Sequence, residues 1–278
     1  MKRFKHFIRC SLSICCVLFA SCGNDEEPGN GGQYPVVFAT AIDGLVNTRA
    51  TVDNIWNGGE QVQVSIDGAA ASTFTAAANG KLTANVPVFW QTGQSITVRA
   101  WYPSGWDMQA DQSAQSAYQA ADFIFAPEKA ITYAERNTAS LEFSHKTAKV
   151  TATLTAGVNI ANLADATVSF YGYTEGTANT GNGTLLGGNN GWIMSRKKEN
   201  GVFTALLIPQ NMTGLKFIRV SFWLIDYYYT PAGDEADLKA GRSYTYYITL
   251  NTTGLTVTSN IIPWDNSTES GIADVPVP

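Results

Sequence analysis

Cysteine and histidine are scarce in this chain of 278 residues. No cysteine follows Cys22, and His145 is the one histidine after position 6. A disulfide framework and a cysteine or histidine metal site are therefore excluded for most of the chain. A Ser-His-Asp set would have to use His145, and no Gly-x-Ser-x-Gly motif accompanies it. The sequence thus predicts no enzyme, no cofactor and no metal, with a structural role for His145.

Positive charge is also sparse. Residues 22–278 carry 14 Lys and Arg against 23 Asp and Glu, which is a net charge of −9. No basic patch with interleaved aromatic residues is present, so nucleic acid is not an expected partner. Beyond the first 21 residues, no apolar run is long enough for a transmembrane helix.

The N-terminus has the features of an export signal. Basic residues within the first nine positions precede a short apolar stretch, 12–20, which is too short to span a bilayer. The sequence Phe19-Ala20-Ser21-Cys22 resembles the lipobox of bacterial lipoproteins. We expect residues 1–21 to be removed and Cys22 to carry the lipid anchor. The acidic, glycine-rich tether 22–33 resembles the surface-export signal of Bacteroidetes lipoproteins, which implies a surface-exposed lipoprotein of the outer membrane.

The remainder of the chain alternates apolar and polar residues with a period of two, as strands do. The clearest such segments are 61–67, 95–102, 149–155, 217–224 and 244–250. Turn signals that favour positive φ separate such runs, at Asn57-Gly58-Gly59, Asn79-Gly80, Asn190-Gly191 and Asn200-Gly201. One short helix is expected, at about 108–121. The pattern predicts an all-β chain of two β-sandwiches, 34–147 and 148–278.

Several segments together resemble the fimbrillin family of Bacteroidales, the subunits of type V pili. Their order and spacing carry the resemblance, which covers essentially the whole chain after the signal. The segments are Thr48-Arg49-Ala50-Thr51, Trp56 to Val64, Ala100-Trp101-Tyr102-Pro103, Tyr118 to Ala126, Leu141 to Val150, Leu207-Ile208-Pro209-Gln210, Gly241 to Tyr246 and Ile262-Pro263-Trp264. Glu60 departs from the family, which often has Asp at this position.

The resemblance implies two tandem transthyretin-like (Greek-key) β-sandwich domains in a fimbrial subunit. It also implies that an arginine-specific protease cuts between Arg49 and Ala50 and that subunits then polymerise by strand exchange. The cut would remove the lipid together with a first strand at 34–42, whose inward face is formed by Tyr34, Val36, Phe38 and Ile42. An edge exposed in this way is a template for a strand from a neighbour. The partners would be other fimbrial subunits and surface ligands of a host or another bacterium.

Two questions stay open from the sequence. The donor strand is either the C-terminal tail, with Ala273, Val275 and Val277 in alternation, or the segment Gly254 to Trp264. The second concerns function: a surface lipoprotein that binds glycans without polymerising is the alternative, with exposed tryptophans as the binding platform. The candidates are Trp101, Trp106, Trp192 and Trp223. The acidic residues between Asp226 and Asp237 are expected to form a solvated loop.

Overall fold

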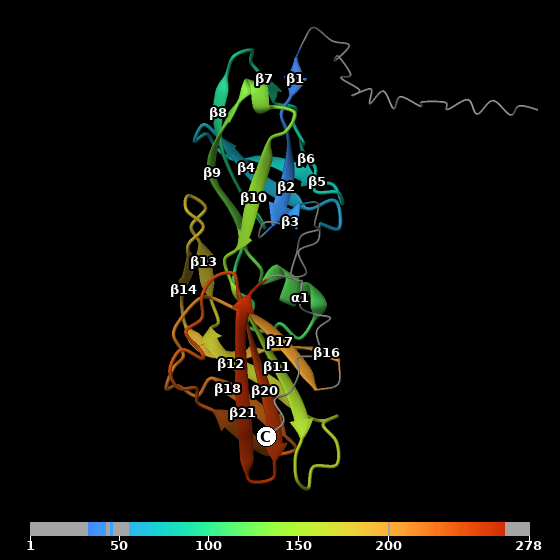
Figure 1. Cartoon of the computed structure of the whole chain (residues 1–278), viewed down its shortest axis with the longest axis vertical. Helices are drawn as coiled ribbons and strands as arrows, with labels where there is room; N and C mark the ends of the chain where they lie inside the picture. Colours follow the sequence, from blue (N-terminus) through green and yellow to red (C-terminus); the bar gives the residue numbers. More distant parts are fainter. Residues whose placement is uncertain (1–32, 43–44, 47–55, 200, 265–278) are drawn as a thin grey trace, which may run out of the picture. The chain divides into compact units, whose positions relative to one another are not determined.

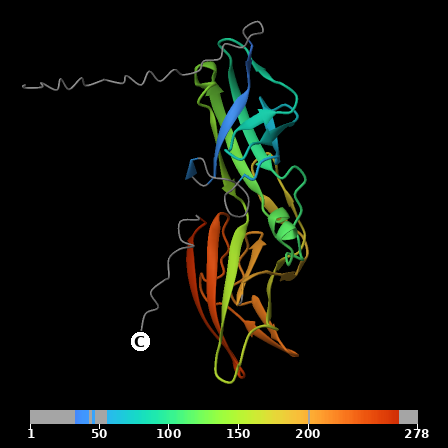
Figure 2. The ribbon, with the colours of Figure 1, turned by 90° about the vertical axis from the view of Figure 1, so that its right-hand side faces the viewer.

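The computed structural model describes residues 33–42, 45–46, 56–199 and 201–264. Nearly every regular element in them is a strand, so the prediction of an all-β, β-sandwich fold is confirmed (Figures 1 and 2). None of the helices among these residues is long and apolar enough to cross a membrane.

The first half of the chain forms one sheet that closes on itself. Its strands are β2 (Val37–Ile42), β3 (Leu45–Val46), β4 (Gln61–Ile66), β5 (Ser72–Ala76), β6 (Leu82–Ala84), β8 (Ser95–Tyr102), β9 (Ile124–Thr132) and β10 (Ser140–His145). They are ordered β10-β9-β8-β4-β5-β6-β2-β3, and β10 also pairs with β2. A separate pair, β1 (Tyr34–Pro35) with β7 (Phe89–Trp90), completes this half, and a 3₁₀ turn, η1 (Tyr133–Glu135), follows β9.

The second half is a sandwich of two sheets. The first sheet has the order β16-β17-β11-β20-β21 and the second β15-β12-β18-β19. The bounds are β11 (Ala148–Ala156), β12 (Thr167–Tyr173), β15 (Asn190–Met194), β16 (Arg196–Glu199), β17 (Val202–Leu207), β18 (Ile218–Phe222), β19 (Ile225–Tyr229), β20 (Arg242–Asn251) and β21 (Gly254–Pro263). A small hairpin pairs β13 (Gly176–Ala178) with β14 (Leu185–Gly187).

Two large hydrophobic cores follow from these sheets. The first contains only residues between Val36 and Phe143. The second lies between the two sheets of the sandwich, where for example the rings of Phe217 and Tyr246 meet edge to face at 5.7 Å. It also takes in side chains of the segment from Trp101 to Phe125. We propose that the cores belong to two domains that meet near Lys146, between the end of β10 and the start of β11.

Two local predictions need correction. The predicted short helix is present as α1, but it spans only Gln115–Ala120, because the Asp111 carboxylate accepts hydrogen bonds from the Ser113 amide and hydroxyl and forms a turn before it. Asn190 and Gly191 begin β15, where Gly191 pairs with Gly172, and form no turn. The other glycines of the predicted turns do have positive φ: Gly58, Gly59, Gly80 and Gly201.

Candidate functional site

The strand β2 occupies a slot between two strands that do not otherwise pair. On one side it pairs in parallel with β10, from Ala39 opposite Ser140 to Ile42 opposite Phe143. On the other side it pairs antiparallel with β6, where Phe38 lies opposite Leu82. Figure 1 shows β2 in blue between its two neighbours. In the described part of the chain, β2 alone joins these two edges and closes the sheet.

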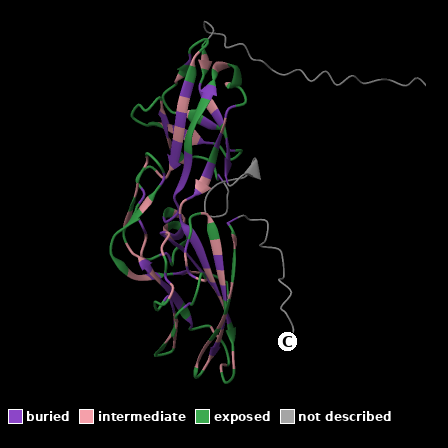
Figure 3. Cartoon of the chain, turned by 60° about the vertical axis from the view of Figure 1, so that its left-hand side comes forward, coloured by how far each residue is buried: buried purple, intermediate pink, exposed green. Residues whose placement is uncertain are grey.

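The predicted strand 34–42 is divided into β1 and β2 at Val36, and alternate side chains of this whole segment pack into the first core. Val36, Phe38 and Ile42 are each at most 3% exposed, and Tyr34 is half-buried. The Phe38 ring packs against Phe74 of β5, with 5.8 Å between centroids. The purple segments of the upper half in Figure 3 mark this buried interior. The slot therefore combines backbone pairing on both sides with an apolar floor.

A polar contact fixes the position of the strand. The buried Thr40 hydroxyl donates to the Gly80 carbonyl at 2.8 Å and accepts from the Trp56 indole at 2.7 Å. A Cβ atom on Gly80, whose φ is +80°, would lie only 2.8 Å from the Thr40 oxygen. A shift of β2 by one residue would break both bonds and turn its apolar side chains outward. The sequence reasoning missed this set, although Asn79-Gly80 had marked the turn.

The other predicted site residues lie outside the described residues. These are the lipid-anchor residue Cys22, the cleavage-site residues Arg49 and Ala50, and the tail residues Ala273, Val275 and Val277. The alternative donor segment is described. Its strand β21 pairs antiparallel with β20 along its whole length, from Gly254 to Pro263.

Trp264 fastens the end of β21 to the rest of the fold. Its side chain is 2% exposed and stacks on the His145 ring at a centroid distance of 3.8 Å. The buried His145 Nδ1 lies 3.0 Å from the Asp122 carboxylate, which also accepts from the Thr147 hydroxyl at 3.2 Å. His145 thus joins β10 to the segment before β9 and to the end of β21. These contacts hold three parts of the fold together.

Replacing His145 with Gln is expected to lower the free energy of unfolding by about 1–3 kcal/mol, since buried Asp122 loses a partner and Trp264 its stacking surface. Urea unfolding monitored by tryptophan fluorescence measures the change. Glu142→Gln on the exposed face of the same strand is the control and should change stability by less than about 0.5 kcal/mol. Equal stability of the two variants would contradict the structural role.

The acidic residues between Asp226 and Asp237 are engaged locally rather than gathered around a cation. Asp226 accepts from the Ser221 hydroxyl at 2.6 Å, Glu235 from the Tyr229 hydroxyl, and Asp237 pairs with Lys239 at 2.8 Å. Burial, followed by the hydrogen bond to Glu235, raises the pKa of Tyr229. Within the described residues, no group of three or more His, Cys, Asp or Glu side chains could hold a metal ion.

The four candidate platform tryptophans do not form one surface. Trp101 and Trp106 are each 8% exposed and belong to the second core. Trp192 is half-buried beneath the Arg219 guanidinium, which lies 4.7 Å from its ring. Trp223 alone is largely exposed, at 77%. The idea that all four tryptophans form one glycan-binding surface is therefore wrong.

Solved structures with this fold include two that match most of this chain. A structure from Bacteroides uniformis, described provisionally as a cell adhesion protein, is 19% identical, with a TM-score of 0.65 over 83% of this chain and 98% of that one. A second, from Bacteroides ovatus and described in the same way, is 17% identical, with a TM-score of 0.65 over 84% and 99%. Comparison with curated proteins finds no match.

The sequence itself matches the profile of a family described as fimbrillin-like over residues 48–264. This match covers the second core and all of the first core except Val36, Phe38 and Ile42, and it ends at Trp264. It agrees with the prediction of a structural protein rather than an enzyme. Since it spans well over half of the sequence, the chain belongs to the fimbrillin-like family.

Proposed function

We propose that this chain is the structural subunit of a cell-surface fimbrium and contributes to adhesion. It is exported as a lipoprotein held in the outer membrane through Cys22 and is matured by cleavage after Arg49. Subunits then join by strand exchange, in which a strand of one subunit replaces β2 of the next. Three features of the chain support this sequence of events: the first strand that closes the sheet, the position of Arg49 in the sequence and the 14 residues that follow Trp264.

The first strand is the observation that carries the proposal. The family match begins at residue 48, immediately before Arg49, so β2 lies outside the part that matches the family. Yet β2 closes the first sheet and its core. Cleavage after Arg49 would separate this strand from the body of the subunit. The body would then have an empty slot of six residues, the length of β2, and the edge of β7 that pairs with Tyr34 and Pro35 would be exposed as well.

An empty slot would be a strong binding site for another strand. The edges of β6 and β10 would expose unpaired amides and carbonyls, and the floor would expose apolar side chains such as Phe74 and Phe143. Each large apolar side chain buried there contributes roughly 1.5–3 kcal/mol as an upper estimate. Because the chain's own strand fills the slot before cleavage, the precursor cannot accept a donor.

We propose the C-terminal tail as the donor. The segment Gly254 to Trp264 is held by β20 along its length and by the buried Trp264 side chain. Removing it would strip an edge strand from the second sandwich and break the stacking on His145. The 14 residues after Trp264 are long enough to span the slot, and Ala273, Val275 and Val277 offer an apolar face at strand spacing. Pro276 and Pro278 have no amide hydrogen to donate, so up to two hydrogen bonds of the ladder would be absent.

Removal of residues 265–278 tests the proposal directly. Purified precursor should remain monomeric until a trypsin-like protease is added, and should then form oligomers that survive dodecyl sulfate without boiling. The truncated chain should be cleaved equally well but stay monomeric, because it has a slot and no donor. Mixed with intact cleaved subunits, it should cap oligomers and shorten the ladder. A full ladder from the truncated chain alone would refute the tail as donor.

A further inference from the structure

The hairpin that joins β18 to β19 has an unusual tip. Phe222 pairs with Ile225, and the two loop residues between them are Trp223 and Leu224. Trp223 is 77% exposed, Leu224 is fully exposed and Ile225 is 56% exposed. Turns of this length normally use small polar residues or glycine. Side chains this exposed add little to the hydrophobic core.

Trp223 also has an unfavourable backbone conformation. Its φ is +56°, in the region that side chains with a Cβ rarely adopt and that bulky residues almost never do. Glycine is the preferred residue at such a loop position in a two-residue hairpin. An indole here therefore costs stability and gains little burial. Strain of this kind concentrates at functional sites.

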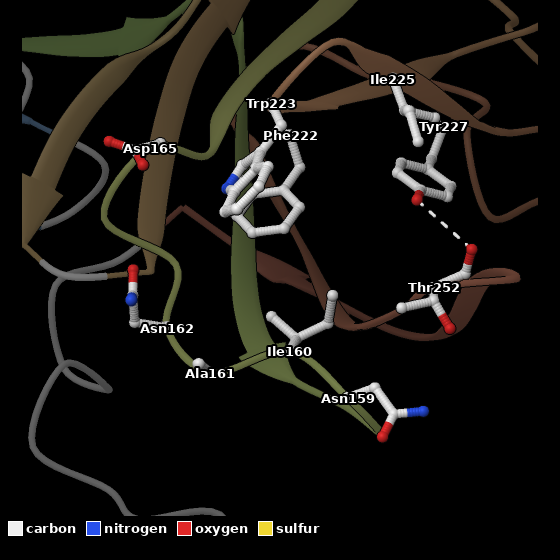
Figure 4. A pocket seen from close by; sticks show the side chains of 10 residues that line it. All are labelled: Asn159, Ile160, Ala161, Asn162, Asp165, Phe222, Trp223, Ile225, Tyr227 and Thr252. Atoms are coloured by element: carbon white, nitrogen blue, oxygen red, sulfur yellow. Dashed lines mark hydrogen bonds between the residues drawn. The ribbon is translucent and has the colours of Figure 1, made fainter.

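A cavity of about 380 Å³ lies beside this tip. One wall is formed by Phe222, Trp223 and Tyr227, and the loop between β11 and β12 provides the opposite wall, with Asn159, Asn162 and Asp165. Figure 4 shows the Trp223 and Phe222 rings side by side above Ile160, with Asn162 and Asp165 to one side. The Tyr227 hydroxyl is bonded to the Thr252 carbonyl at 3.4 Å, which holds that ring in place. The volume is in the range of small-molecule pockets, roughly 300–1,000 Å³.

Polar groups along the loop wall are available to a ligand. No hydrogen bond within the described residues involves the side chain of Asn159 or the carboxylate of Asp165. The Asn162 oxygen accepts from the Ala164 amide at 3.1 Å, which leaves its amide nitrogen to donate elsewhere. Asp165 is the one charged residue that lines the cavity, and neither lysine nor arginine does. Anionic ligands are therefore disfavoured.

We propose that this pocket binds a neutral hexopyranose residue of a polysaccharide. A pyranose ring has an apolar face of C–H groups that can lie on the Trp223 indole, and a rim of hydroxyls that can donate and accept hydrogen bonds. The Asp165 carboxylate accepts from these hydroxyls, the Asn159 amide can both donate and accept, and the Asn162 amide nitrogen donates. A flat aromatic wall opposite a wall of amides and one carboxylate matches this combination. The site does not involve β2, so the inference is independent of strand exchange.

Titration of the purified full chain with cellotriose, mannotriose and N-acetylchitotriose, followed by saturation-transfer NMR, tests the proposal. At least one of these neutral sugars should bind, and trigalacturonate should bind at least about tenfold more weakly because of Asp165. Trp223→Gly should weaken binding at least about tenfold while Tm stays equal or rises, since glycine relieves the positive φ. Leu224→Ala, a change on the same tip outside the cavity lining, should leave binding unchanged.

Three results would overturn the inference. The first is that no neutral trisaccharide binds at about 10 mM, a concentration at which even weak sites fill. The second is binding of trigalacturonate as tight as that of the neutral sugars. The third is an equal loss of binding in Leu224→Ala and Trp223→Gly, which would identify the exposed tip as a protein contact rather than a sugar pocket.

Discussion

Replacing Arg49 with Ala is expected to abolish fimbria and leave a lipid-tethered monomer on the cell surface. Without cleavage, β2 stays covalently attached and keeps its slot filled. An external donor would then have to displace a strand that is already at high local concentration, so exchange should be negligible. The measurement is the ladder of heat-labile oligomers on a denaturing gel run without boiling, together with electron microscopy of the cells.

Two companion variants sharpen this result. Arg49→Lys should also block assembly in cells if the protease is arginine-specific, yet trypsin should restore the ladder in vitro because it cleaves after lysine. Cys22→Ala should lose palmitate labelling and membrane attachment while the Arg49 site stays intact. A normal ladder from Arg49→Ala would mean that cleavage occurs elsewhere or that the subunits do not polymerise by exchange.

Phe38→Ala is expected to destabilise the precursor but not the fimbrium. The Phe38 side chain is 1% exposed and its ring packs against Phe74. Its truncation should therefore lower the free energy of unfolding of the uncleaved chain by about 3–5 kcal/mol. If cleavage after Arg49 removes β2, as proposed, the strand that carries Phe38 is no longer part of the mature subunit. Denaturant unfolding should therefore show a less stable precursor, whereas the temperature at which the assembled oligomers dissociate should stay unchanged.

The matched control is Phe74→Ala, on the other side of the same ring contact. Phe74 belongs to β5 and stays with the subunit body, so its truncation should weaken both the precursor and the oligomers. If Phe38→Ala lowers the dissociation temperature of the oligomers as much as Phe74→Ala does, then β2 remains in the assembled fibre and strand exchange at this slot is excluded.

Much of the fold was predictable because two-residue periodicity is a local property of strands. The segments 61–67, 95–102 and 149–155 correspond to β4, β8 and β11 within one or two residues. The order of strands was not predictable, since the parallel pairing of β2 with β10 joins residues about one hundred positions apart. Composition alone also overestimated the length of α1. The alanine and glutamine residues of 108–121 favour a helix, but they do not reveal that Asp111 forms a turn with Ser113.

The site was predictable only in part, because two-residue periodicity reports local structure and not long-range contacts. Alternation indicated which face of residues 34–42 is apolar, but the contacts of Thr40 with Trp56 and Gly80 depend on three segments that meet only in the fold. In the sequence, Trp223 was one of four tryptophans that were equally good candidates for a glycan-binding surface. Only exposure and a positive φ separate it from Trp101 and Trp106, and neither property is visible in the order of residues.

If subunits join by strand exchange at the β2 slot, as proposed, the two walls of that slot give the fibre a direction. One wall pairs in parallel and the other antiparallel, and the two ladders space their hydrogen bonds differently. A donor strand that ran in the opposite direction would not match the hydrogen-bond spacing of either wall. Each donor must therefore enter with the same N-to-C direction. Head-to-tail contacts of this kind do not close on themselves and build an open filament with two unlike ends. In such a filament one end would present an unfilled slot and the other an unused donor tail. A subunit without a donor tail would then stop growth at one end, and a subunit without an open slot would stop growth at the other.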